Sequence, residues 1–192
     1  NNHDNALCIK CDVAQEKQIK DAFQLTADHF GKIDVLFNNA GIFTPQARID
    51  QIDIKDWQKS LDVNLTGMFL SAREAFKHMR EKGGRIINNG SISAHTPREG
   101  SVPYTTTKHA ITGLTKTIAL DGRDLNICCG QIDIGNAHTE MVANLSNAGG
   151  VVETMAVSDA AEAVWNMAQL PLSTNILTMT IMANKMPFVG RG

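Results

Sequence analysis

The sequence predicts an α/β protein built on a doubly wound parallel sheet with helices on both faces. Strand-like and helix-like segments alternate along all 192 residues, as they do when β-α-β units repeat with right-handed crossovers. Most strand-like segments are short apolar runs without polar alternation, which is typical of strands covered on both faces. A chain of this length can bury one sizeable core, so we expect residues 1–192 to form a single domain.

The individual elements follow from their apolar patterns. The expected strands are residues 7–12, 33–38, 85–89, 126–130 and 176–182. The expected helices are residues 15–30, 53–81, 102–120 and 157–169. In the first helix the apolar residues form one broad stripe, and Gly31 follows it as a C-cap. The long pattern over 53–81 predicts a short helix and then a longer one through 64–80.

Charge and composition disfavour several classes of partner. The chain has 18 Lys and Arg against 20 Asp and Glu, and no basic block stands out. This balance argues against nucleic acid or an anionic membrane as the main partner. No apolar run approaches the roughly 20 residues of a membrane span, and no signal peptide is visible. We therefore expect a cytoplasmic protein.

The four cysteines favour buried thiols over a metal site. Cys8 and Cys11 have the C-x-x-C spacing of zinc and redox motifs. On a strand, however, residues three apart face opposite sides, and so do neighbours such as Cys128 and Cys129. The six histidines show no metal-ligand spacing. We expect reduced, buried cysteines and no metal.

The most specific chemical signal is a tyrosine and a lysine one helical turn apart. Tyr104 and Lys108 occupy positions i and i+4 of an expected helix, so they project from one face. An ammonium group there can stabilise a phenolate, whose ordinary pKa of about 10 is too high for a general base near neutral pH. Ser91, at the end of the preceding strand, can orient a substrate oxygen. Taken singly, these residues are more often a plain helix surface and a turn.

Three further motifs are ambiguous when each is taken alone. Asn38-Asn39-Ala40-Gly41 ends a strand, where ligands bind in an open α/β sheet, but it is also an ordinary turn sequence. Asn64 lies inside an expected helix, where its side chain competes for backbone hydrogen bonds and can mark a kink. Asp12-Val13 ends the first expected strand, although Asp12 is an equally good N-cap for the helix over 15–30.

In combination, these motifs resemble those of the short-chain dehydrogenase/reductase family, in order and spacing, over nearly all of the chain. The resemblance implies a Rossmann-like fold and hydride transfer between NAD or NADP and a small-molecule secondary alcohol or ketone. It implies that Tyr104 is the general acid/base and that Lys108 stabilises its phenolate and binds the nicotinamide ribose. Ser91 would hold the substrate oxygen, and Asn64 would support a proton-relay water.

The same resemblance implies a set of cofactor contacts. Asp12 and Val13 would contact the adenine ring, and the stretch Asn39, Ala40 and Gly41 would pack beside the central part of the cofactor. After the strand over 126–130, Ile134 and Thr139 would also contact the cofactor. Family members associate through the helices that correspond to 64–80 and 102–120, so the resemblance implies a homodimer or homotetramer.

The chain departs from the family pattern in two places. The family begins with a strand and a glycine-rich turn that binds the cofactor pyrophosphate at a helix N-terminus, and neither is found here. The first strand of this chain matches the third of the family, so residues 7–12 and 33–38 should not be paired. We expect that about 50 residues precede this sequence; the alternative is a genuinely short chain. The usual Pro-Gly pair is also absent from the loop at 130–137, which with 144–150 would determine substrate specificity.

Two functional hypotheses remain open at this point. The first is an NAD- or NADP-dependent dehydrogenase/reductase. The second is a non-catalytic protein that keeps the fold as a scaffold or binding module and cannot hold the cofactor. The presence of Asn64, Ser91, Tyr104 and Lys108 together favours the enzyme, since packing alone gives no reason to retain all four.

Overall fold

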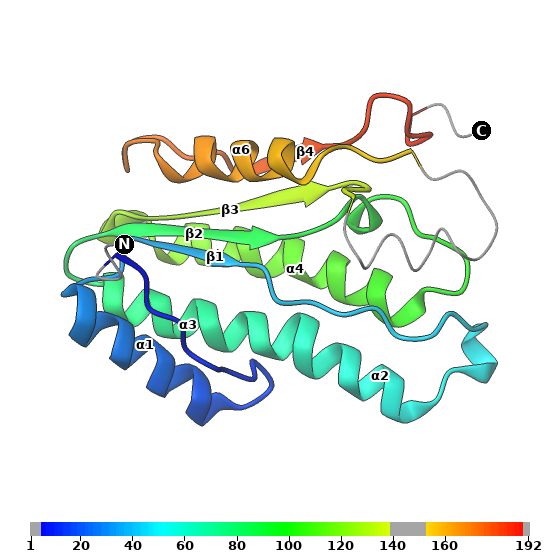
Figure 1. The fold of residues 1–192 in the computed structure, drawn as a ribbon, viewed down its shortest axis with the longest axis horizontal. Helices are drawn as coiled ribbons and strands as arrows, with labels where there is room; N and C mark the ends of the chain where they lie inside the picture. Colours follow the sequence, from blue (N-terminus) through cyan, green and yellow to red (C-terminus); the bar gives the residue numbers. More distant parts are fainter. Residues whose placement is uncertain (1–4, 139–152, 190–192) are drawn as a thin grey trace.

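The computed structural model describes residues 5–138 and 153–189, and a parallel sheet lies at its centre (Figure 1). Its strands are β1 (Val35–Asn38), β2 (Gly84–Asn89), β3 (Ile127–Ile134) and β4 (Thr178–Ile181). They lie side by side in the order of the chain, and each pair is parallel. The predicted Rossmann-like α/β architecture is confirmed. Because the strands are parallel, their carboxyl ends meet at one edge of the sheet.

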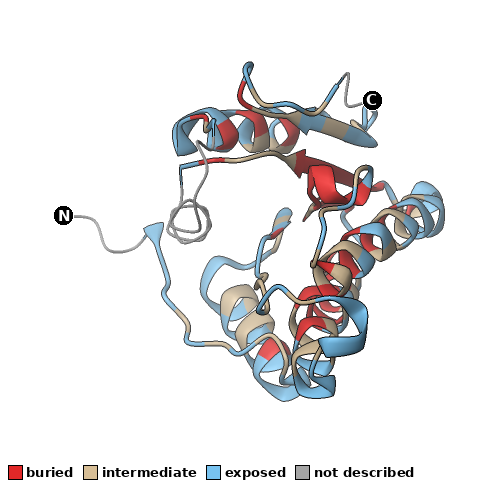
Figure 2. Cartoon of the chain, turned by 90° about the vertical axis from the view of Figure 1, so that its right-hand side faces the viewer, coloured by how far each residue is buried: buried red, intermediate tan, exposed pale blue. Residues whose placement is uncertain are grey.

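Helices cover the two faces of this sheet (Figures 1 and 2). The helices α1 (Glu16–Phe30), α3 (Gly67–Met79) and α4 (Val102–Asp121) lie on one face, and α6 (Val157–Ala168) lies on the other. The neighbours Ile86 and Ile87 of β2 point to opposite faces. Ile86 joins a core cluster with residues of α3, and Ile87 joins another with Ala163 and Met167 of α6. This division follows from the two-residue period of a strand.

The expected long helical stretch has an irregular turn at its middle. The helix α2 (Ile54–Leu61) continues through a π-helical turn, Asp62–Thr66, directly into α3. Asn64 lies inside this turn and is fully buried. The irregularity expected at Asn64 is therefore present as a π-helical turn, in which the backbone hydrogen bonds span one residue more than in an α-helix.

One expected strand is wrong. Residues 7–12 are in no strand, and they run outside the sheet before α1 begins (Figure 1). A strand requires a hydrogen-bonded neighbour, and among the described residues β1 pairs only with β2. Residues 7–12 and 33–38 are thus not paired among the described residues, and the separation of these segments by two further strands stays a prediction. Cys8 is consequently exposed and Cys11 half-buried, whereas Cys128 and Cys129 are buried in β3 as expected.

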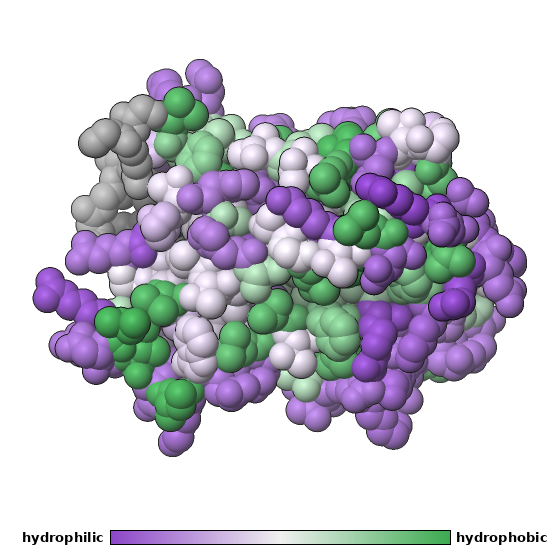
Figure 3. Space-filling view, turned by 180° about the vertical axis from the view of Figure 1, so that it is seen from behind, coloured by the Kyte–Doolittle hydropathy of each residue, from purple (hydrophilic) through white to green (hydrophobic). Residues whose placement is uncertain are grey.

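The exposed apolar side chains of the described residues come from several elements of the fold. Apolar residues lie in several separate groups among polar ones on the face seen in Figure 3. β1 also leaves Val35 and Phe37 partly exposed along its unpaired edge. The homodimer or homotetramer stays a prediction. In the part of the chain that the structure describes, no helix is long and apolar enough to cross a membrane.

Candidate active site

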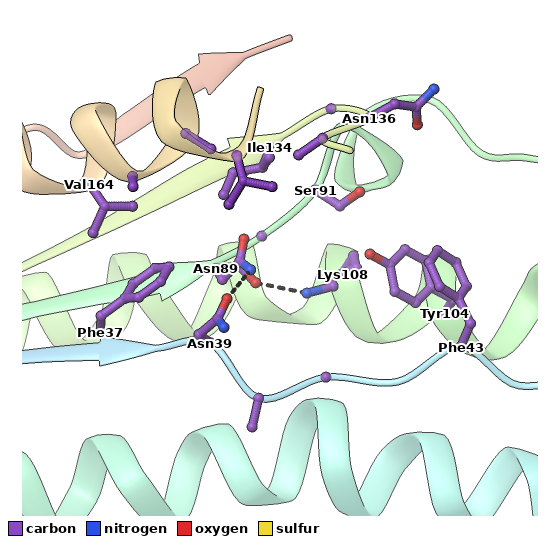
Figure 4. Close-up of a pocket in the computed structure, with 18 of the residues that line it drawn as sticks. Phe37, Asn39, Phe43, Asn89, Ser91, Tyr104, Lys108, Ile134, Asn136 and Val164 are labelled. Carbon is purple, nitrogen blue, oxygen red and sulfur yellow. Dashed lines mark hydrogen bonds between the residues drawn. The ribbon is translucent and has the colours of Figure 1, made fainter. Parts of the chain in front are cut away.

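A cleft of about 590 Å³ lies at the carboxyl ends of β1, β2 and β3. Seven of the predicted site residues line it, and they are Asn39, Ala40, Gly41, Ser91, Tyr104, Lys108 and Ile134. They come from three strand ends and one helix that are distant in the sequence. Parallel strands joined by crossover helices bring them to a single edge (Figure 4).

Tyr104 stands in the first turn of α4, at the cleft wall. Its ring stacks on that of Phe43, with ring centroids 3.8 Å apart, so packing fixes the orientation of the phenol. Burial raises the pKa of Tyr104, and the charge of Asp133 adds to this, while the Ser91 hydroxyl and the charge of Arg98 lower it. The phenol is therefore held in its protonated form near neutral pH.

Lys108 lies one turn further along α4 and is buried. Its Nζ donates a hydrogen bond of 2.8 Å to the carbonyl oxygen of Asn89 and lies 5.4 Å from the centroid of the Tyr104 ring (Figure 4). Burial lowers the pKa of Lys108 to about 8, and the carboxylate of Asp133 acts in the opposite direction. Lys108 is thus held in place beside the tyrosine. Its ammonium group loses its charge at a lower pH than that of a surface lysine.

A buried carboxylate holds Ser91 in place. The Ser91 backbone N–H donates to Oδ1 of Asp133 at 2.9 Å, and the amide of Gln131 donates to the same oxygen at 2.6 Å. The other oxygen, Oδ2, lies 2.7 Å from Nε2 of His95. Asp133 is fully buried in β3, next to Ser91 at the end of β2. The serine that faces Tyr104 is therefore anchored to the neighbouring strand by its own backbone.

Asn64 acts on the turn that follows β1. Its Oδ1 accepts a hydrogen bond of 2.7 Å from the backbone N–H of Ile42, and its Nδ2 donates at 2.9 Å to the carbonyl of the same residue. Both polar atoms of Asn64 are thus engaged in fixing Ile42, which lies between Gly41 in the cleft and Phe43 against Tyr104. The proton-relay role of Asn64 stays a prediction.

Two of the predicted cofactor contacts do not join this group. Asp12 and Val13 are not among the residues that line the cleft. The carboxylate of Asp12 accepts a hydrogen bond from the backbone N–H of Ala14 in the turn before α1, but the N-cap of α1 is Gln15, so the N-cap alternative for Asp12 is wrong as well. Val13 packs against Gly67 of α3. Thr139 lies outside the described residues.

The cleft also contains residues that the sequence analysis missed. Asn89 connects two strand ends, because its Nδ2 donates to Oδ1 of Asn39 at 2.7 Å (Figure 4). Its own Oδ1 is buried without a hydrogen-bond partner among the described residues. Arg98 and Asn136 line the same cleft. Asn89 could have been predicted as a cleft residue, since it ends a predicted strand. Nothing in the local sequence singles out Arg98.

Within residues 5–138 and 153–189, no group of three or more His, Cys, Asp or Glu side chains is arranged to hold a metal ion.

Comparison with known proteins gives one consistent result. A family model described as short chain dehydrogenase matches residues 1–167. Glucose 1-dehydrogenase 2 of Bacillus subtilis is 35% identical over 141 residues, which are 72% of this chain and 55% of that protein. Trans-4-hydroxycyclohexanecarboxylate dehydrogenase of Sinomonas cyclohexanicum is 34% identical over 162 residues, which are 81% of this chain and 62% of that protein. This chain thus spans somewhat more than half the length of these relatives.

A solved structure, ElxO with NADP bound, has the same fold. It is 27% identical, with a TM-score of 0.79 over 88% of this chain and 74% of that one.

Proposed function

Because the chain belongs to the short-chain dehydrogenase family, we propose that its protein is an oxidoreductase that moves a hydride between NAD or NADP and a small secondary alcohol or ketone. The observation that carries this proposal is the grouping of Ser91, Tyr104 and Lys108 around one cleft at the carboxyl edge of the sheet. The names of the relatives, dehydrogenases of glucose and of a hydroxycyclohexanecarboxylate, are consistent with an alcohol as substrate.

The cleft suits the nicotinamide half of such a cofactor. Its wall at Asn39, Ala40 and Gly41 is made of small residues, so a flat ring can approach the backbone. The buried Oδ1 of Asn89 is an acceptor that lacks a donor, which an amide or hydroxyl of a bound ligand would supply. We propose that Asn39, Gly41, Asn89 and Lys108 contact that half of the cofactor. When bound, the nicotinamide supplies the hydride donor or acceptor.

The residues of the chain supply the proton chemistry. In the reduction direction, Tyr104 donates its Oη proton to the ketone oxygen as that oxygen gains negative charge. Ser91 orients the same oxygen by a hydrogen bond, and Lys108 stabilises the phenolate that is left. In the oxidation direction Tyr104 is the base. Because the pKa of its phenol is raised, Tyr104 is protonated at neutral pH, which is the form that ketone reduction needs.

The rates in the two directions should depend oppositely on pH. Alcohol oxidation needs the Tyr104 phenolate, so its rate should rise as pH increases, whereas ketone reduction should slow. Replacing Lys108 with Met removes the charge 5.4 Å from the ring centroid, an interaction on the order of 3 kcal/mol at an effective dielectric constant near 20. This energy corresponds to about two pH units. We expect the midpoint of the oxidation profile to move upward by less than this, because Lys108, whose pKa is lowered to about 8, loses charge within the range of the profile. The measurement is the rate of alcohol oxidation from pH 6 to 11, a range that includes the ordinary pKa values of tyrosine and lysine, roughly 10 and 10.4.

Lys116→Met is the matched control, because Lys116 is an exposed lysine of the same helix. Its profile should superimpose on that of the unchanged protein. An unshifted profile for Lys108→Met would show that the lysine does not tune the tyrosine.

The proposed function itself is tested by a reductase assay on the full-length protein. A panel of aliphatic, cyclic and acyclic hydroxy ketones is offered with NADH and separately with NADPH, and nicotinamide absorbance is followed. We expect turnover of at least one ketone and a preference for one of the two cofactors. If no ketone and no alcohol is converted with either cofactor while the protein is folded, the non-catalytic hypothesis is favoured instead. The cytoplasmic location and the single-domain organisation likewise stay predictions.

A further inference from the structure

The cleft has two chemically different ends. Phe37 and Val164 form an apolar end, and Tyr104 with Phe43 lies at the other, where Asn136 and Ser91 also stand (Figure 4). Since Tyr104 must meet the substrate oxygen, the second end is the place for the substrate. The other residues that line this end should therefore indicate which chemical groups the substrate carries.

Arg98 is the charged residue of this end. It lines the cleft, and its Nη2 donates a hydrogen bond of 3.0 Å to Oδ1 of Asn136. Its charge also acts on the Tyr104 phenol, whose pKa it lowers. Arg98 and Tyr104 are therefore close enough to serve the same bound molecule.

The side chain and the backbone of Arg98 are both held. The Ser101 hydroxyl donates to the carbonyl oxygen of Arg98 at 2.8 Å, and the loop is tied to a second segment by a bond from the Ala47 N–H to the Gly100 carbonyl. Asn136 is itself fixed, because its carbonyl accepts from the N–H of Met155. An arginine that is already positioned loses little conformational entropy when it binds a ligand.

The charged side chains that line the cleft are both cations, and the buried carboxylate of Asp133 beside them is already bonded to Ser91, Gln131 and His95. Among the described residues that line the cleft there are two cations, Arg98 and Lys108, and no aspartate or glutamate. Lys108 is directed to the carbonyl of Asn89, but Arg98 forms no ion pair with any carboxylate in the described part of the chain. A guanidinium has five N–H donors, and Asn136 accepts from only one of its nitrogens. The others are available to an anion.

We propose that Arg98 determines specificity by binding a carboxylate of the substrate, so that the alcohol is a hydroxy acid and the ketone an oxo acid. This inference rests on the proposed function and extends it to a substrate class. The planar fork of a guanidinium matches a carboxylate with two parallel hydrogen bonds. The carboxylate takes no part in the reaction; it places the carbon that bears the hydroxyl or ketone beside Tyr104.

The test compares acids with neutral analogues. Oxopentanoates that differ in the position of the ketone are each paired with the corresponding primary amide, and kcat/KM is measured for both members of a pair. For the best acid, Arg98→Met should lower kcat/KM by about 10- to 100-fold, the range expected for hydrogen bonds to a charged group, mainly through KM. The amide should change by less than about threefold. Arg98→Lys should restore part of the loss for the acid, because it keeps the charge without the fork.

A binding measurement removes the dependence on turnover. Calorimetry of levulinate, the oxopentanoate with its ketone farthest from the carboxylate, should show weaker binding to Arg98→Met than to the unchanged protein. Arg123→Met is the control, since Arg123 is an exposed arginine beyond the end of α4, and it should change neither measurement.

The outcomes separate the two proposals. If neither acids nor amides react but levulinate binding depends on Arg98, the proposed function fails and the carboxylate site stands. If ketones react but acid and amide are affected equally, the carboxylate site is wrong and Arg98 only supports the loop. If instead the KM for NADPH or NADH rises with substrate KM unchanged, Arg98 serves a cofactor phosphate, which also overturns the inference.

Discussion

Replacing Tyr104 with Phe is expected to lower kcat by about 10²- to 10⁴-fold, the usual contribution of a positioned general acid, and to leave cofactor binding intact. The substitution removes only the hydroxyl. The ring keeps its stacking on Phe43 at 3.8 Å, so neither the fold nor the cleft wall should move. Turnover of the best ketone gives the loss, and quenching of intrinsic fluorescence by NADPH or NADH shows that the cofactor still binds. A loss of less than about tenfold would contradict the role of Tyr104 as the proton donor.

The same variant gives a direct titration of the phenol. Tyr104 is the one tyrosine of this sequence, and in any longer protein the difference between the unchanged protein and Tyr104→Phe isolates its signal. The absorbance of tyrosinate should appear at a pH above the ordinary value of about 10 when no cofactor is bound, because burial raises the pKa. A midpoint below that value would mean that Ser91 and Arg98 outweigh the effect of burial.

Replacing Arg85 with Met is expected to lower the free energy of unfolding by about 2–4 kcal/mol, on the scale of hydrogen bonds to a charged group. Arg85 is 1% exposed, although it carries a full charge inside β2. Its guanidinium donates to four acceptors in the segment between α6 and β4, which are Asn175 Oδ1 and the carbonyl oxygens of Leu170, Pro171 and Thr174. Methionine has a similar volume and no donor, so the segment would lose its attachment to the sheet.

Urea unfolding of the variant and the unchanged protein measures this loss. Arg80→Met is the matched control, because Arg80 is exposed near the end of α3, and it should change stability by no more than about 0.5 kcal/mol. A loss below about 1 kcal/mol for Arg85→Met would show that water replaces the guanidinium at these carbonyls. Arg85→Lys should recover only part of the loss, since an ammonium has three donors for these four acceptors.

Much of this fold could be predicted because its determinants are local. Apolar runs of five or six residues and helical stripes between them are visible in the sequence, and they place four strands and the main helices within a few residues. The pair Tyr104 and Lys108 was predictable for the same reason, since residues one turn apart on a helix share a face. Ser91 and Gly41 could be predicted as site residues because they come just after strands, and the carboxyl ends of parallel strands meet at one edge of the sheet.

The parts that could not be predicted depend on contacts between distant residues. Residues 7–12 have the composition of a strand, but pairing needs a neighbouring strand, and a local pattern does not reveal its absence. Arg98 lies in a loop without periodicity and meets Asn136 across 38 positions of sequence. Asp133 lies three residues beyond the expected strand 126–130, whereas β3 runs on to Ile134. Its bonds to Ser91, Gln131 and His95 depend on the register between β2 and β3.

The wide turn at Asp62–Thr66 makes the site sensitive to the number of residues as well as to their identity. Each residue of a regular α-helix turns the chain by about 100°, and a π-helical turn accommodates one additional residue within the run. With one residue deleted from this turn, either Asn64 would swing away from Ile42 or the α3 face that carries Ala72 and Met79 would rotate off the sheet. The π-helical turn thus fixes the rotation of α3 about its axis relative to α2. Single-residue insertions or deletions between the two helices should therefore be far less tolerated than substitutions at Val63 or Leu65.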